Sequence, residues 1–451
     1  MGAEGRSRIP GAVLRHPLAS VILLSLLLRL ALMPILTYEF DIYHWGVILQ
    51  NIWSGNGLYD VAGYYYTPVW GYVMGVVSWL MDTAGGPALI GERFTELLPI
   101  EDLACRYHIA TVTTIGFNVA MKAVLVVCDY LVAAMVYRFT EERTGDARRA
   151  VLAAALWLFC IPVVYMSAVQ AQFDSLSALL MMATVVLVYR DRAFLAGAVF
   201  ACSVLLKFFP FFSILVMVAY LWVRHRDDGL GLRRIAEAAA GAVLMFAVLY
   251  LPQILDGTLL DSLSFVTGRV ENSSPLVHAF TYLQMAVMVA GMLVTGLLML
   301  RPGEDADTRF LSLTLVSLLF AVLTSNTPQY MIVFMPLLCM AVAEGRRYMR
   351  PYAVMTVGSL VMALSLNNFS LLLSLSESTS LVQPGTVLSL MQGMESVTLL
   401  GATSVDILSA LGGVIVFLGM LLLLMIYFRS PIARSMPRLG RLIDMLGGCG
   451  E

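Results

Sequence analysis

Long apolar runs separated by short polar segments dominate this chain, and they restrict it to a membrane fold. Only 13% of the 451 residues are charged and 59% are hydrophobic, whereas soluble domains carry about 25% charged residues. Each run has about the length that a helix needs to cross a bilayer, so the pattern predicts an all-α polytopic membrane protein. The expected spans are 18–36, 109–137, 150–169, 173–190, 194–223, 236–254, 276–300, 310–324, 328–343, 352–369 and 405–428.

Two runs do not fit a single upright span. The run 194–223 is too long for one helix and holds Lys207 and Pro210 near its middle, which predicts a break close to Lys207. The run 67–81 is short, and if it crossed the membrane it would move the arginines of 138–149 to the outer side. Either this run is a re-entrant or juxtamembrane helix, or the basic loop breaks the rule. We favour the first, because the segment 82–108 carries more acidic than basic residues.

Clusters of arginine orient the bundle, because arginine is enriched in cytoplasmic loops. Arg6, Arg8 and Arg15 precede the first run, and no small-residue cleavage site follows it, which predicts a retained signal-anchor helix. The other clusters lie in 138–149, 224–234, 346–350 and 429–441. We expect cytoplasmic tails at 1–17 and 429–451 around one transmembrane domain, 18–428, in the cell membrane. The segments 37–66, 170–173, 255–275 and 370–404 then face outward.

The polar residues give no sign of several other functions. The net charge of −2 argues neither for nor against nucleic-acid binding. No basic stripe interleaved with aromatic residues appears, so we expect no nucleic-acid partner. The six cysteines are scattered, without the spacing of a zinc site, a redox pair or a disulfide framework.

The first outer loop, 37–66, holds an acid in an aromatic setting. Asp41 follows the first apolar run, and the run from Ile42 to Trp53 has helical periodicity with Trp45, Leu49 and Trp53 on one face. This predicts a short helix lying in the membrane interface with aromatic anchors. Asp41 has two equal interpretations at this point: an N-cap of that helix, or a functional carboxylate kept near the membrane despite its cost.

Two further polar groups interrupt apolar helices. Gln170, Gln172 and Asp174 form a tight turn whose amides and carboxylate suit hydroxyl groups, although Asp174 as a helix cap is an equal alternative. Lys207 needs an anionic partner or a water-filled cavity within an apolar helix pair. A lipid-linked phosphate would be such a partner, and snorkelling to the interface is the alternative.

Weaker candidates lie further along the chain. Arg269 is suited to binding a phosphate or to pairing with Glu271, and His278 is either a general base or, as we favour, an interface histidine. Gln329 and Tyr330 offer polar groups at an outer helix end, where an ordinary turn is the alternative.

Taken in order, these stretches resemble the GT-C glycosyltransferases, specifically the bacterial and archaeal members related to polyprenyl-phosphate-mannose-dependent mannosyltransferases. The matching pieces run from the first span to about Arg350. They are Asp41-Ile42-Tyr43, Gly55-Asn56-Gly57-Leu58-Tyr59, Tyr66-Thr67-Pro68, Gln172-Phe173-Asp174, Lys207 with Pro210, and Pro328-Gln329-Tyr330 with Pro336. The sequence departs from the family where Ala171 precedes Gln172, since relatives usually have glycine there, and where Thr67 precedes Pro68.

The resemblance implies a GT-C-like bundle of about 11–13 transmembrane helices, with short interfacial helices in the first outer loop. It implies an inverting glycosyltransferase that moves a hexose, with mannose favoured, from a polyprenyl- or dolichyl-phosphate sugar to a glycolipid, glycan or protein acceptor. The reaction would take place on the outer membrane face. The alternative is a polytopic transporter or flippase for lipid-linked glycans without transferase activity, but transporters more often show inverted repeats, and this sequence shows none.

The resemblance also implies roles for single residues. Asp41 would be the general base, and Lys207 and Arg269 would hold the donor phosphate. The candidates for binding sugar or acceptor are Tyr43, His44, Tyr59, Tyr66, Gln170, Gln172, Asp174, His278, Gln329 and Tyr330. No metal or other cofactor is expected, because relatives with monophosphate donors generally look metal-independent and the first outer loop has no Asp-x-Asp. Glu39 precedes Asp41 by two positions, which leaves a dimetal site open.

Overall fold

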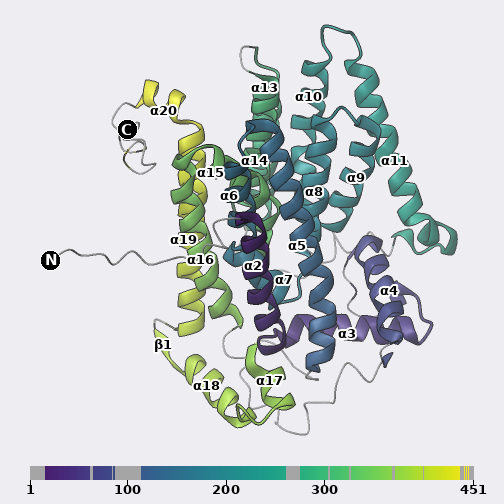
Figure 1. The fold of residues 1–451 in the computed structure, drawn as a ribbon, viewed down its shortest axis with the longest axis vertical. Helices are drawn as coiled ribbons and strands as arrows, with labels where there is room; N and C mark the ends of the chain where they lie inside the picture. The colour runs from purple at the N-terminus through teal and green to yellow at the C-terminus, as the bar shows by residue number, and fades with distance from the viewer. Residues whose placement is uncertain are drawn as a thin grey trace.

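The computed structural model describes residues 16–60, 64, 66–83, 85–86, 113–260, 275–302, 305–324, 327–367, 371–399, 401–436, 441, 443 and 445. This part of the chain is a bundle of helices (Figure 1). Its strands are limited to one short antiparallel hairpin, β1 (Thr398–Leu399) with β2 (Ala402–Thr403). The predicted all-α polytopic class is therefore confirmed.

Five of the described helices are long and apolar enough to cross a membrane. They are α2 (Pro17–Ile35), α5 (Ile115–Thr144), α11 (Gly231–Asp256), α13 (Pro275–Met299) and α19 (Ser404–Tyr427). A sixth candidate span is the pair α6 (Ala147–Leu158) and α7 (Ile161–Ala168), bent by 50°. The bundle is completed by α8 (Asp174–Tyr189), α9 (Ala193–Leu206), α10 (Ile214–Arg224), α14 (Ala306–Val322), α15 (Met335–Glu344) and α16 (Met349–Asn367).

The predicted break near Lys207 is present. Helix α9 ends at Leu206, and Lys207 is extended, with φ −144° and ψ 133°. A 3₁₀ helix, η5 (Phe209–Ser213), then carries Pro210 into α10. Proline has no N–H to donate to the preceding turn, so a continuous helix would lose a hydrogen bond there. The break turns the Lys207 side chain inward, beside η6 (Pro328–Val333).

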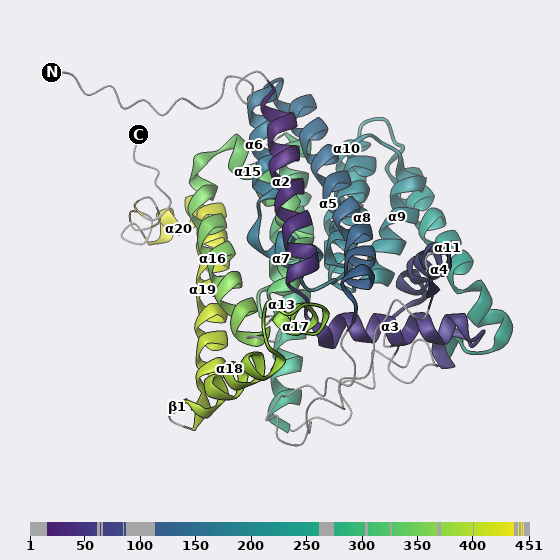
Figure 2. The same cartoon turned by 60° about the horizontal axis from the view of Figure 1, so that its bottom comes forward.

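Helix α3 (Glu39–Trp53) lies across one end of the bundle, crosswise to α2 and α5 (Figures 1 and 2). We call this the α3 end. Helix α4 (Pro68–Asp82) packs against α3, where Trp53 Nε1 donates to the Ser78 carbonyl at 3.4 Å. The short helices η1 (Leu58–Asp60), α17 (Leu373–Ser378) and α18 (Pro384–Ser396) lie at the same end. Run 67–81 therefore forms a helix beside α3, and its re-entrant or juxtamembrane placement stays a prediction.

The predicted aromatic face of α3 serves a different purpose from the expected one. Trp45 and Leu49 are buried in a hydrophobic cluster with Trp70 and Phe173, instead of anchoring the helix in the interface. The reason is that α4 covers this face, and removing large apolar side chains from solvent stabilises the pair.

The arginine-rich turns lie at the opposite end of the bundle. One such turn joins the end of α5, which carries Arg138 and Arg143, to the start of α6. The α10–α11 turn is another, and η7 (Arg346–Tyr348) with the start of α16 is a third (Figure 1). Helix α20 (Arg429–Ser435) follows α19 on this side. The arginine clusters therefore gather at one end of the bundle, away from α3, as the sequence predicts.

Candidate functional site

Asp41 lies in the first turn of α3 and does not cap it. The helix begins at Glu39, and its N-cap residue, Tyr38, makes no side-chain capping bond. The capping interpretation of Asp41 is therefore wrong, because the helix starts at Glu39, three residues before the expected start at Ile42. The Asp41 carboxylate instead takes part in a tertiary contact, accepting a hydrogen bond at Oδ2 from Gln170 Nε2 at 2.8 Å.

Burial raises the pKa of Asp41 from its ordinary value to about 6. Hydrogen bonds from Gln172 and Gln170 and the positive charge of Lys207 oppose this rise, while the Asp174 carboxylate adds to it. A carboxylate with such a pKa is ionised at neutral pH and is a stronger proton acceptor than an exposed aspartate. These are the properties that general bases require.

The turn between α7 and α8 is folded back on itself by its own backbone. Gln170 N donates to the Tyr165 carbonyl and Gln172 N to the Met166 carbonyl, both at 2.9 Å. Ala171 has φ 58°, in the left-handed region that glycine adopts most easily. Its carbonyl accepts a bond from Trp45 Nε1 at 2.9 Å. Trp45 and Gln170 thus tie α3 and this turn together from both sides.

Lys207 and Asp174 form an ion pair next to Asp41. Lys207 Nζ lies 2.5 Å from Asp174 Oδ1, and the two side chains are only 11% and 3% exposed. The ammonium also lies over the rings of Phe173 and Tyr330, 5.0 and 5.1 Å from their centres. Such rings stabilise a cation that has lost its water. Asp174 is the first residue of α8 and makes no capping hydrogen bond, so the interpretation of Asp174 as a helix cap is wrong. Because Lys207 pairs with Asp174, its side chain does not snorkel to the membrane interface.

Two buried oxygens beside this pair carry no hydrogen bond within the described residues. They are Gln170 Oε1 and Asp174 Oδ2. A buried acceptor without a donor costs about 1–3 kcal/mol. A ligand with hydroxyl groups would remove that cost, so the arrangement is suited to a polyhydroxylated molecule.

An aromatic cluster forms the wall of the site on the side of α4. The ring of Phe173 lies 4.8 Å from Trp70, 5.0 Å from Tyr66 and 5.9 Å from Trp45. Tyr59 joins it by donating from its hydroxyl to the Tyr66 carbonyl at 3.2 Å. Thr67, which departs from the family pattern, donates to the Leu205 carbonyl and so holds the start of α4 next to the Lys207 break.

The structure gathers most of the predicted site residues at the α3 end. Asp41, Gln170, Gln172, Asp174, Lys207 and Tyr330 form its centre, with Tyr59 and Tyr66 in the aromatic wall. Tyr43 and His44 are half-buried on α3, and Gln329 is half-buried in η6. Arg269 lies outside the described residues, and so does the side chain of His278, which belongs to the first turn of α13.

Sequence reasoning missed a set of buried charges behind the site. Arg29 Nε lies 2.9 Å from Asp129 Oδ2, and neither side chain is exposed. Lys122 is fully buried and donates to the Met33 and Leu36 carbonyls at 2.9 and 2.7 Å. The rule that drew attention to Asp41, that ionisable groups in apolar spans have a purpose, would have found these residues. Trp70, which belongs to the aromatic wall, carries no charge, and no feature of the sequence identified it as a site residue.

The dimetal arrangement left open by Glu39 does not form around Asp41. Glu39 Oε2 accepts bonds from Thr113 N and Oγ1 at 3.0 and 2.9 Å. Among the residues that the structure describes, no group of three or more His, Cys, Asp or Glu is arranged to hold a metal ion. Independence from metals stays a prediction.

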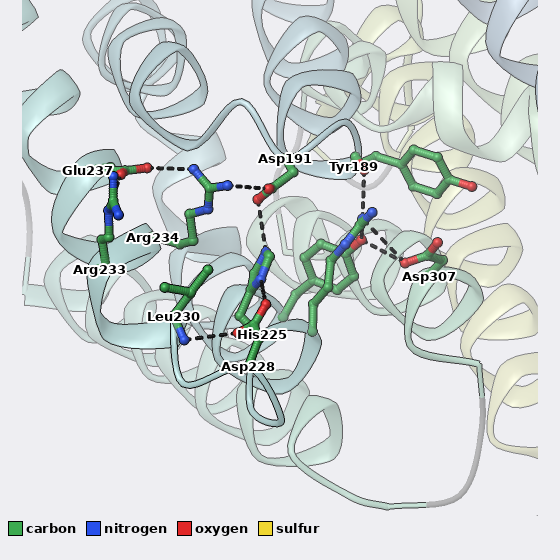
Figure 3. A network of polar contacts seen from close by, with 11 residues as sticks. Tyr189, Asp191, His225, Asp228, Leu230, Arg233, Arg234, Glu237 and Asp307 are labelled. Atoms are coloured by element: carbon green, nitrogen blue, oxygen red, sulfur yellow. Dashed lines mark hydrogen bonds and ion pairs between the residues drawn. The ribbon is translucent and has the colours of Figure 1, made fainter.

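A second polar cluster lies at the other end of α8 (Figure 3). His225 Nδ1 is 2.8 Å from Asp228 Oδ2, and its Nε2 is 2.9 Å from Asp191 Oδ1. Arg234 Nη2 donates to Asp191 Oδ2 at 2.6 Å. This cluster joins the α8–α9 turn to the α10–α11 turn, on the arginine-rich side of the molecule.

Comparison with models of protein families assigns the chain to a family. The model of glycosyltransferase family 87 matches residues 107–374, more than half of the sequence. The chain belongs to glycosyltransferase family 87. This is a GT-C-type family, so the predicted membership of the GT-C superfamily is confirmed. The match includes the Gln170–Asp174 turn, Lys207 and Tyr330, and it begins after Asp41. A search of curated proteins finds no significant match. The protein is therefore a glycosyltransferase with a multi-pass membrane fold.

Proposed function

We propose that this family 87 enzyme transfers a hexose, with mannose favoured, from a polyprenyl- or dolichyl-phosphate sugar to a hydroxyl group, with inversion. The acceptor would be a glycolipid, a glycan or a protein. The observation that carries the proposal is the presence of a base and a cation in one cluster. Asp41 is hydrogen-bonded to the turn that leads to Asp174, and Asp174 pairs with the buried Lys207.

In the proposed reaction Asp41 acts on the acceptor. Its carboxylate takes the proton of the acceptor hydroxyl while that oxygen attacks the anomeric carbon from the side opposite the phosphate. The bond between the anomeric carbon and the phosphate oxygen breaks, and the lipid phosphate leaves with the electron pair. A phosphate is a good leaving group, so the protein mainly has to align the reactants and stabilise the charge that develops on the phosphate.

Lys207 is suited to stabilising the negative charge that develops on the leaving phosphate. Its ammonium is a compact cation with three donors, of which Asp174 uses one. Low exposure strengthens its attraction to an anion compared with the same charge in water. We propose Arg269 as a second phosphate ligand.

The buried acceptors fit the sugar. Gln170 Oε1 and Asp174 Oδ2 would each accept a bond from a sugar hydroxyl and so gain the partner that the described residues do not supply. Gln172, the aromatic wall and the half-buried Tyr43, His44 and Gln329 complete the proposed binding residues. His278 is a proposed contributor from α13.

The proposed location is the cell membrane, with the α3 end outward. The supporting argument is that the arginine-rich turns gather at the opposite end, and such turns stay in the cytoplasm. Both termini would then be cytoplasmic. A lipid-linked donor would keep its chain in the bilayer while its phosphate reaches Lys207, and we propose that no metal takes part.

The test is a transfer assay with the full chain in lipid nanodiscs. Labelled polyprenyl-phosphate mannose is supplied together with lipid extract from the native membrane. We expect a labelled product from the wild type and at least about 100-fold slower transfer by Asp41→Asn and Lys207→Glu. Transfer that survives Asp41→Asn would overturn the role of Asp41. Translocation of the donor across liposomes without transfer from any lipid-linked sugar would favour the flippase alternative.

A further inference from the structure

Helix α5 carries two fully buried charged side chains about two turns apart on one face, Lys122 and Asp129. Lys122 Nζ donates to three oxygens at the end of α2: the carbonyls of Met33 and Leu36 and Thr37 Oγ1, at 2.9, 2.7 and 2.8 Å. These oxygens lie just before Asp41 in the chain. Lys122 therefore fixes the corner from which α3 departs.

Asp129 makes the corresponding contacts with the turn that carries Gln170. Its Oδ2 accepts a bond from Ser167 Oγ at 2.6 Å, and its Oδ1 accepts one from Ser175 Oγ at 2.5 Å. Ser167 and Ser175 stand on the two sides of the turn, one near the end of α7 and the other in the first turn of α8. One carboxylate thus holds both ends of the turn.

Arg29 completes this arrangement from α2. Its Nε donates to Asp129 Oδ2 at 2.9 Å, and its Nη1 donates to the Leu158 carbonyl at 2.8 Å. With both oxygens engaged, the carboxylate cannot rotate without losing a bond. Since Gln170 reaches Asp41 across the same region, the relative position of α2, α5 and the turn decides whether the 2.8 Å bond between Gln170 and Asp41 forms.

We infer that Asp129 is a positioning residue for the transfer reaction, acting through Ser167 and Ser175 to hold Gln170 against the Asp41 carboxylate. The inference rests on the proposed role of Asp41 as general base. Stability alone does not explain the arrangement, because replacing a buried ion pair with apolar side chains is often neutral or favourable. A site held to within about half an ångström, in contrast, needs a fixed supporting layer behind it.

Ser175→Ala is the variant that tests this, and Ser177→Ala is its matched control. Both serines are buried in α8, but Ser177 Oγ has no hydrogen-bond partner among the described residues, whereas Ser175 Oγ bonds Asp129. The first readout needs no substrate. Infrared titration of the carboxyl C=O band of Asp41, with Asp41→Asn as the reference, gives the pH at which Asp41 loses its proton.

We expect Ser175→Ala to move this midpoint above the wild-type value, because Gln170 would donate less effectively to the ionised carboxylate. The same variant should lower kcat by about tenfold with little change in KM for polyprenyl-phosphate mannose. Ser177→Ala should leave the midpoint and kcat near those of the wild type.

An unchanged Asp41 midpoint in folded Ser175→Ala protein would overturn the inference, and so would equal shifts in the two serine variants. This failure is separable from failure of the proposed function. If Asp41→Asn keeps wild-type transfer, the proposed function of Asp41 fails. If Asp41→Asn is inactive while Ser175→Ala behaves like Ser177→Ala, only the positioning role fails.

Discussion

Each end of helix α8 adjoins a turn in which one non-glycine residue has left-handed backbone angles, a conformation that is sterically strained. Different contacts stabilise the two turns. Ala171 at the α3 end and Asp191 at the opposite end both have φ 58°. Aspartate tolerates this conformation better than most residues, and Asp191 also accepts bonds from Arg234 and faces His225. Ala171 has no polar side chain, and its turn is instead held by Trp45 and by the neighbouring Gln170.

The difference shows what each end is built for. At the opposite end the charged groups pair across turns while remaining partly in water, and the side chains of Asp191 and Arg234 are 26% and 27% exposed. A single ion pair that is partly exposed contributes little to the free energy of unfolding. At the α3 end, the Lys207 and Asp174 side chains are only 11% and 3% exposed and Asp41 beside them is half-buried, at a cost that binding a substrate would offset. We therefore expect substitutions at the α3 end to affect turnover, and those at the opposite end to affect stability slightly.

The largest expected effect that separates the two ends is that of Asp41→Asn. Loss of a general base lowers turnover by about 100- to 10,000-fold, and transfer from polyprenyl-phosphate mannose measures it. The matched control is Asp307→Asn at the opposite end, where Asp307 accepts from the Tyr220 hydroxyl and lies near Arg224. This control should keep transfer near the wild-type level. Comparable losses in both variants would contradict the assignment of chemistry to the α3 end.

At neutral pH, Asp41→Asn should be at least as stable as the wild type. The folded pKa of Asp41 is raised to about 6, so the protonated carboxyl stabilises the fold at low pH and that contribution is lost as pH rises through about 6. At neutral pH the ionised carboxylate therefore costs stability. Asp41→Asn should melt at or above the wild-type temperature, and a clearly lower melting temperature would contradict this.

A smaller effect on turnover is expected from replacing the buried pair behind the site. The double variant Arg29→Met/Asp129→Leu removes both charges together and should unfold within about 2 kcal/mol of the wild type. Asp129→Leu alone leaves Arg29 unpaired and should lose about 3–5 kcal/mol. Because the double variant no longer anchors Ser167 and Ser175, its turnover should still fall about tenfold. Full activity in a stable double variant would show that the pair serves folding only.

The smallest effect concerns the two strained turns themselves. Ala171→Gly should stabilise the protein by about 1 kcal/mol, because glycine adopts φ 58° without a steric penalty. Asp191→Gly relieves the same backbone strain but removes the contacts with His225 and Arg234, so it should not stabilise. Chemical unfolding of the two variants in detergent measures both. Stabilisation by Asp191→Gly equal to that by Ala171→Gly would show that the contacts of Asp191 contribute nothing.

The sequence predicted the helices and the break at Lys207 well, because apolar length and proline act locally. It also selected Asp41, Gln170, Asp174 and Lys207, which the structure brings together. It did not predict that Lys207 pairs with Asp174, since the choice of partner depends on how α8 and α9 pack. It placed Trp45 at the membrane surface because the periodicity of α3 identifies an apolar face without identifying α4 as its cover.

The buried charges of α5 were missed for a related reason. Lys122 and Asp129 lie within a run that is apolar enough to span a membrane, and hydropathy averages them away. Their partners, the end of α2 and the serines of α7 and α8, are distant in sequence and adjacent only in the folded bundle.

The central claim is that Asp41 is a base whose proton affinity is raised by burial, and the pH dependence of single-turnover transfer tests it most directly. The wild-type rate, measured from about pH 5 to about pH 8 with saturating donor, should be constant at the upper end. It should fall tenfold per pH unit below about pH 6, because protonated Asp41 cannot accept the acceptor proton. A rate that stays constant through pH 6 in folded enzyme, or that rises as pH falls, would contradict the account.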